Sequence, residues 1–106
     1  MNPLDVLSFT PEHMIFIDFE TFYDPKSKYS LTVMPPVEYI RDERFEVIGV
    51  GVQIDDEPGE WLEEHEFRAF ARAFDWSKAT VVGHNLGGFD ALIMAIKYGI
   101  KAGAWV

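Results

Sequence analysis

Two acidic side chains, Asp18 and Glu20, stand two residues apart at the end of the apolar run 14–17. Side chains at i and i+2 of an extended strand point to the same face. The spacing therefore predicts two neighbouring carboxylates, with Phe19 on the opposite face. Carboxylates held this close repel each other, and a hard cation such as Mg²⁺ or Mn²⁺ relieves the repulsion. A strand end that enters solvent and hydrates both acids is the alternative, and the spacing alone leaves both interpretations open.

A second polar group lies in the segment GHNLGGFD, residues 83–90. His84 and Asn85 follow a short apolar stretch, at the carboxyl end of a predicted strand, and ligands of open α/β sheets gather outside such ends. Asp90 opens a helical pattern, where the helix N-terminus favours a carboxylate. The same residues could instead form a polar turn and the start of a helix. Both this structural interpretation and a role in binding remain open.

Hydrophobic periodicity predicts the elements that position these side chains. Residues 14–18 carry apolar side chains on both faces of the predicted strand, which is typical of a central strand covered on both sides. In the segment after residue 63, apolar residues recur at helical spacing, with Arg68 and Arg72 on the other side of the helix. The predicted strands are 14–18, 45–55, 60–63 and 80–85, with a further strand beginning in 102–106; the predicted helices are 64–75 and 86–99, with a short helix or turn near 37–43.

This order of elements predicts an α/β fold with a mixed sheet. The first three strands form a meander, and the later strand–helix–strand units need parallel, right-handed crossovers. If strands 14–18 and 80–84 are parallel neighbours, their carboxyl ends lie side by side. Asp18, Glu20 and Asp90 would then surround one crevice, and three convergent carboxylates without a basic partner call for metal.

Two motifs in this order resemble those of a known enzyme family. FIDFET resembles the first motif of the DEDD 3′–5′ exonucleases, and HNLGGFD resembles their second motif, in which an Asn precedes an aromatic–Asp pair. The stretch between the motifs is similar to proofreading domains of phage and bacterial family A DNA polymerases. The resemblance covers residues 14–106, with 1–13 as a lead-in segment, and it implies a ribonuclease-H-like fold.

The resemblance implies a two-metal hydrolysis of the 3′-terminal phosphodiester bond of single-stranded DNA. Asp18 and Glu20 would hold the first Mg²⁺ or Mn²⁺ ion, with Asp18 bridging to the second, and Asp90 would complete the second site.

The same resemblance assigns roles to neighbouring residues. Thr21 and Phe22 would contact the terminal nucleotide, and His84 and Asn85 would lie near the substrate strand. Phe89 is expected to be a core anchor.

The sequence also departs from this family. No Asp or Glu follows Asp90, so the fourth acid and the Tyr or His that accompanies it are missing. We therefore expect a partial domain that lacks its last helix and is weakly active or inactive. Its uncovered sheet face would be apolar and would meet a polymerase domain in cis or another protein chain. The alternative is a non-catalytic module that binds such a partner, and a third interpretation keeps catalysis but changes the substrate to RNA or structured DNA.

Composition narrows the class of protein further. The net charge is −9, with 18 acids against 9 Lys and Arg, which argues against a DNA-binding protein that relies on a basic surface. The absence of Cys excludes disulfides and zinc–thiolate sites. No apolar run is long enough to span a membrane, so we expect a cytoplasmic protein that binds no membrane.

Overall fold

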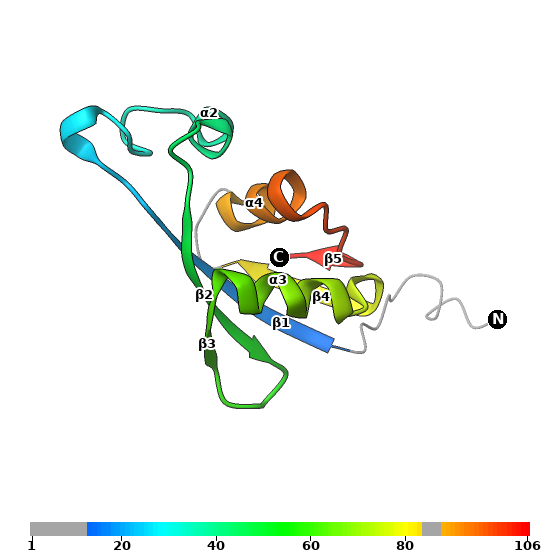
Figure 1. Ribbon diagram of the computed structural model, residues 1–106. Coiled ribbons are helices and arrows are strands. Elements are labelled where there is room, and N and C mark those ends of the chain that lie inside the picture. Colours follow the sequence, from blue (N-terminus) through cyan, green and yellow to red (C-terminus); the bar gives the residue numbers. More distant parts are fainter. Residues whose placement is uncertain (1–12, 84–87) are drawn as a thin grey trace.

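The computed structural model describes residues 13–83 and 88–106. These residues form an α/β fold with a single five-stranded mixed sheet and helices packed on it (Figure 1). The strands are β1 (His13–Thr21), β2 (Val47–Ile54), β3 (Glu60–Glu63), β4 (Ala79–Gly83) and β5 (Ala104–Trp105). The helices are α2 (Pro36–Arg41), α3 (Glu64–Ala73) and α4 (Phe89–Tyr98), with short 3₁₀ helices at Pro25–Ser27 and Trp76–Lys78.

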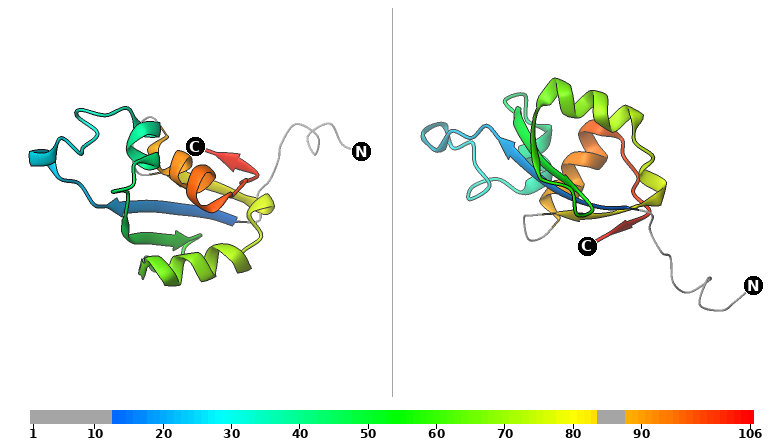
Figure 2. Two further views of the ribbon diagram at one scale, coloured as in Figure 1. Left: turned by 45° about the horizontal axis from the view of Figure 1, so that its top comes forward. Right: turned by 90° about the horizontal axis from the view of Figure 1, so that it is seen from below.

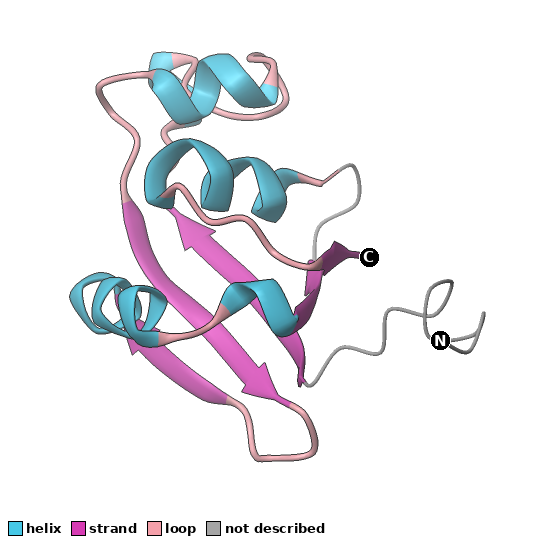
Figure 3. Cartoon of the chain, turned by 90° about the vertical axis from the view of Figure 1, so that its right-hand side faces the viewer, coloured by secondary structure: helices cyan, strands magenta, loops and turns pink. Residues whose placement is uncertain are grey.

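The five strands lie in the order β3-β2-β1-β4-β5 (Figure 3). The pairs β1–β2 and β2–β3 are antiparallel, whereas β1–β4 and β4–β5 are parallel. The predicted mixed sheet, a meander followed by parallel units, is therefore confirmed. In particular, β1 and β4 are parallel neighbours, so their carboxyl ends lie side by side as predicted.

Among the described residues, helices cover one face of β1 and none covers the other. Ile15, Ile17 and Phe19 are fully buried, whereas Met14 and Phe16 are 44% and 40% exposed. The right-hand view of Figure 2 shows α3 and α4 on the same side of the sheet. The prediction of a strand covered on both faces is therefore wrong, because an unbroken apolar run does not reveal which of its two faces is packed.

Strand β1 is also longer than predicted, since it runs on to Thr21. The register with β2 shifts near its end: Glu20 pairs with Gly49 and Thr21 with Val47, which leaves Ile48 without a partner in β1. Such a bulge bends a strand and redirects its end. The two acids thus lie within a paired strand, and the irregularity begins directly after Glu20.

The helix α3 packs on the sheet through its apolar stripe. Phe67 and Ala71 are buried, and Phe70 and Phe74 lie partly buried against the same core. At its N-terminus, Glu63 and Glu66 form a capping box, which satisfies backbone N–H groups that the helix leaves unpaired. The helix ends at Ala73, two residues earlier than predicted, because Asp75 begins the next short helix by accepting a hydrogen bond from the Ser77 N–H.

Two glycines delimit α4. Gly88, at φ 77°, precedes the helix and Gly99, at φ 63°, follows it, and this left-handed conformation suits residues without a Cβ. The helix therefore begins at Phe89 and not at residue 86 as predicted, and it ends at Tyr98, one residue before the predicted end. Ile93 and Met94 are completely buried against the sheet. Within the described ranges, none of the helices has both the length and the apolar character needed to cross a membrane.

Candidate metal centre

Asp18 and Glu20 lie on the open face of β1, as their spacing predicted. Asp18 is half-buried and Glu20 is exposed, whereas Phe19 between them is buried in the core. Neither carboxylate forms a hydrogen bond or an ion pair with any of the described residues. Two like charges on one face, without a cationic side chain beside them among the described residues, agree both with acids hydrated by solvent and with a site for a divalent cation.

The strand next to the acids presents glycines to them. Asp18 pairs with Gly51 and Glu20 pairs with Gly49, so no side chain of β2 stands beside either carboxylate. A Cβ on Gly51 would lie 3.7 Å from the Cβ of Asp18, an ordinary contact. On the β2 side of the two acids, the open face of the sheet therefore consists of glycine backbone, which leaves room for a ligand.

Trp61 of β3 fills part of this open face. A Cβ on Gly49 would lie only 1.9 Å from Cζ2 of Trp61, so the indole rests directly on the glycine that pairs with Glu20. The side chain remains 54% exposed. Sequence reasoning missed Trp61; the signal was the period-2 pattern that places it on the same face as Gly49 and Gly51.

Asp90 reaches the end of β1 from the helical side. Its side chain is 1% exposed, and its Oδ1 accepts a hydrogen bond of 3.1 Å from the Phe19 N–H. Among the described residues, the last β1–β4 pair joins Ile17 to Gly83, and Asp90 meets the backbone of β1 two residues beyond Ile17. The same side chain lies against Gly83, where an added Cβ would stand 3.3 Å from Oδ2.

The structure thus brings Asp90 to the backbone next to Asp18, at the shared carboxyl ends of β1 and β4. Asp90 lies on the helix-covered side of the sheet, while Asp18 and Glu20 project from the open side. Asp90 lies in the first turn of α4, where the helix N-terminus favours a carboxylate. The hydrogen bond from Phe19 is a second structural reason for an Asp at this position.

Thr21 and Phe22 continue from the acids into a cluster of aromatic rings. The Thr21 hydroxyl lies 3.0 Å from the Tyr39 hydroxyl, which donates a hydrogen bond to the Phe22 carbonyl. One face of Phe22 stacks on Tyr29, with ring centres 6.0 Å apart, and the residue is 36% exposed. The segment after Glu20 is therefore held in place, with part of the Phe22 ring accessible.

Tyr29 and Tyr39 form the base of that cluster. Both are buried, their rings stack at 4.5 Å, and the Tyr29 hydroxyl donates to the Tyr39 carbonyl at 2.8 Å. Burial raises the pKa of Tyr29 to about 12, with Tyr39 and Asp42 adding to the effect and Arg44 opposing it. The hydroxyl is thus a neutral donor at physiological pH.

Phe89 is a core residue, as predicted: it is buried, and its ring centre lies 5.8 Å from that of Tyr39. His84 and Asn85 lie outside the described residues.

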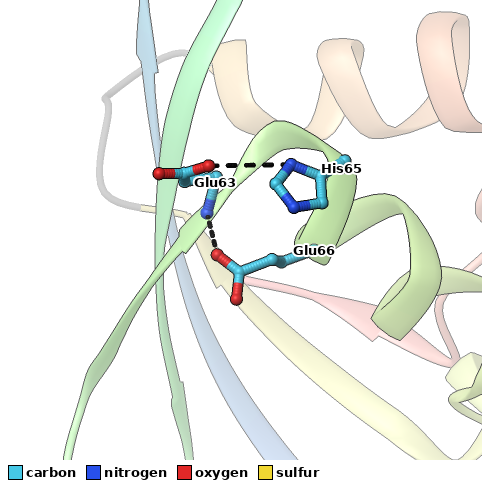
Figure 4. Close-up of side chains that lie close together, drawn as sticks. All are labelled: Glu63, His65 and Glu66. Atoms are coloured by element: carbon cyan, nitrogen blue, oxygen red, sulfur yellow. Dashed lines mark hydrogen bonds and ion pairs between the residues drawn. The ribbon is translucent and has the colours of Figure 1, made fainter.

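A different set of side chains meets the geometric requirements for three metal ligands. Among the described residues, ligand atoms of Glu63, His65 and Glu66 lie within 4.8 Å of one another (Figure 4); Asp18, Glu20 and Asp90 do not form such a group. All three of these residues are exposed, and the capping box of α3 already explains why Glu63 and Glu66 approach. We therefore assign them to the helix terminus.

Comparisons with known proteins add no identification: no protein-family profile matches the chain, and no curated protein or solved structure matches it.

Proposed function

We propose that this chain is part of a 3′–5′ exonuclease domain with a ribonuclease-H-like fold, which binds the 3′ end of single-stranded DNA with Mg²⁺ or Mn²⁺. The observation that supports this most is the hydrogen bond from Phe19 to Asp90. It joins the two segments that resemble the family's motifs, directly beside Asp18. The sheet order and the parallel β1–β4 pair agree with the proposal.

In this proposal Asp18 and Glu20 hold the ions from the open face of β1. The ions would supply an activated water and would stabilise the leaving oxygen. Asp90 positions the end of β1, and hence Asp18, through the Phe19 N–H; the family resemblance assigns it to the second ion as well. The exposed ring of Trp61 lies beside the glycines that pair with the two acids, and Phe22 follows Glu20 by two residues. Such exposed rings can stack on bases.

Metal binding tests the proposal without requiring turnover. Binding of Mn²⁺, followed by electron paramagnetic resonance, should be observed for the wild type and lost in Asp18→Asn/Glu20→Gln. The matched control is Asp56→Asn/Glu57→Gln in the exposed turn between β2 and β3, which removes the same charge elsewhere and should bind Mn²⁺ as the wild type does.

An assay on single-stranded DNA completes the test. Nucleotide release that depends on Mn²⁺ and disappears in Asp18→Ala would support the enzyme, and activity that survives this substitution would refute the assignment of the site. Comparing a DNA with an RNA strand of the same sequence decides the substrate class.

A non-catalytic module is the second candidate, and the open sheet face favours it. Met14, Phe16 and Trp61 are exposed there, and a protein partner could cover them. Absence of Mn²⁺ binding in the wild type would favour the module over the enzyme.

A further inference from the structure

A basic cavity lies between α3 and the end of α4. It has a volume of about 520 Å³, and four cationic side chains line it: Arg68, Arg72, Lys97 and Lys101. The first two stand one helical turn apart on α3, and the other two come from the end of α4 and the residues after it. Cations therefore face the cavity from two separate elements.

This concentration of positive charge contrasts with the rest of the chain. The whole sequence has 9 Lys and Arg against 18 acids, yet four of the nine line this cavity. Solvated surface cations normally spread apart, because like charges repel. The helix dipole favours a cation in the last turn of a helix, which accounts for Arg72 of α3 and Lys97 of α4 taken singly, but it does not explain why the two helix ends and Lys101 meet at one cavity.

Of the four cations, Arg68 alone pairs with an acid among the residues that the structure describes. Arg68 donates to Glu64 at 2.6 Å, and the other oxygen of Glu64 accepts from the Tyr98 hydroxyl at 3.0 Å. Lys97 lies 5.4 Å from the ring centre of Phe45, a cation–π contact. Arg72 and Lys101 form no ion pair with any described residue. The cavity thus holds about three uncompensated charges, and a bound anion would relieve their repulsion.

We propose that this cavity binds the phosphate group of a small phosphorylated molecule of nucleotide size. Guanidinium groups bind phosphate oxygens in pairs, and lysine adds a point charge. The cavity volume lies within the ~300–1,000 Å³ of small-molecule sites, which is larger than a free phosphate needs. Trp76 and Tyr98 also line it, and the indole N–H is already satisfied by the Ala71 carbonyl at 2.9 Å, so the indole offers only apolar atoms to the carrier of the phosphate.

This site is separate from the candidate metal centre. The helices α3 and α4 pack on the face of β1 that holds Phe19, through the rings of Phe67 and Tyr98, whereas Asp18 and Glu20 project from the other face. The inference does not depend on the proposed nuclease function, and its test involves no metal.

Calorimetry and amide NMR with three probes test the site at low ionic strength. Deoxyadenosine 5′-monophosphate should bind, deoxyadenosine should not, and inorganic phosphate shows whether the phosphate alone is sufficient. Binding of the monophosphate should shift the amide signals of Arg72, Gly99 and Lys101. Equal binding of the nucleoside, no binding of either phosphate compound at ~10 mM, or shifts confined to other residues would overturn the proposal.

A pair of matched variants isolates the role of the cavity charges. Arg72→Gln/Lys101→Gln should weaken binding of the monophosphate at least about tenfold, since hydrogen bonds to charged groups are the strong ones. Arg41→Gln/Lys26→Gln removes one Arg and one Lys from exposed positions outside the cavity and should bind as the wild type does. All four side chains are exposed, so circular dichroism should show both variants folded. Equal weakening in the two variants would mean that only the net charge matters and would refute the site.

Discussion

The backbone N–H of Phe19 donates a hydrogen bond to Oδ1 of Asp90, although the two residues are 71 positions apart in the sequence. Phe19 lies between Asp18 and Glu20, and Asp90 lies in the first turn of α4. This one contact ties the strand that carries the two acids to the helix that follows β4. It also gives Asp90 a definite structural role, which can be measured apart from any catalytic one.

Substitution of Asp90 should destabilise the fold. Asp90→Ala leaves the Phe19 N–H without its acceptor, and a buried donor without a partner costs about 1–3 kcal/mol. Asp90→Asn keeps an oxygen that can accept the bond and should lose less. Urea unfolding measures both. A loss below ~0.5 kcal/mol in Asp90→Ala, the range of ordinary surface changes, would show that the contact contributes little.

A methyl group on Gly49 should displace Trp61, whereas one on Gly51 should not. The Gly49 Cβ would lie 1.9 Å from the indole, while the Gly51 Cβ would meet Asp18 at an ordinary 3.7 Å. Gly49→Ala should therefore change the fluorescence of Trp61 and its quenching by acrylamide, and Gly51→Ala is the control. In a Trp61→Phe background the difference between the two should vanish. Identical spectra for both glycine variants would contradict the stacked position of the indole.

The carboxyl group of Asp42 should become protonated at a lower pH than an ordinary surface Asp. Hydrogen bonds from the side chain and the backbone of Arg44 hold the pKa of Asp42 at about 2. A carboxyl whose folded pKa is depressed stabilises the fold above its unfolded pKa of about 3.9 and loses that effect as the pH falls toward 2. NMR titration should give a midpoint near 2, which rises toward the ordinary value in Arg44→Gln. An unchanged midpoint in that variant would refute the cause.

At high pH Tyr29 should stay protonated above the usual phenol pKa of about 10. Burial raises its pKa to about 12, so the neutral form is favoured in the folded protein. Its contribution to stability is complete below the unfolded pKa of about 10 and is lost as the pH rises through 12. Tyr29→Phe should remove this component from the ultraviolet titration. The same component persisting in the variant would assign it to another tyrosine.

Local patterns were enough to predict most of the elements. Periodicity predicted a strand within 45–55 and helices within 64–75 and 86–99, where the structure has β2, α3 and α4. Gly99 ends α4 in the left-handed conformation. These features depend on neighbours within a few residues, which is the range that periodicity and glycine chemistry report.

The covered face of β1 could not be predicted in the same way. Met14, Ile15, Phe16 and Ile17 are all apolar, so their pattern gives no preference between the two faces, and the path of α3 and α4 decides it. The position of Trp61 on Gly49 could not be predicted either, because it depends on the register of β2 with β3.

The sequence by itself determined that Asp18 and Glu20 share one face of a strand, since that follows from the geometry of an extended chain. Only the tertiary structure decided that this face is open, that Asp90 meets the strand at Phe19, and that Arg68 and Arg72 face Lys97 and Lys101 across a cavity. The sequence placed the two arginines only on the side of α3 that faces away from the core. The physical reason is that such contacts join residues far apart in the chain, and they form only where the packing of helices on the sheet brings them together.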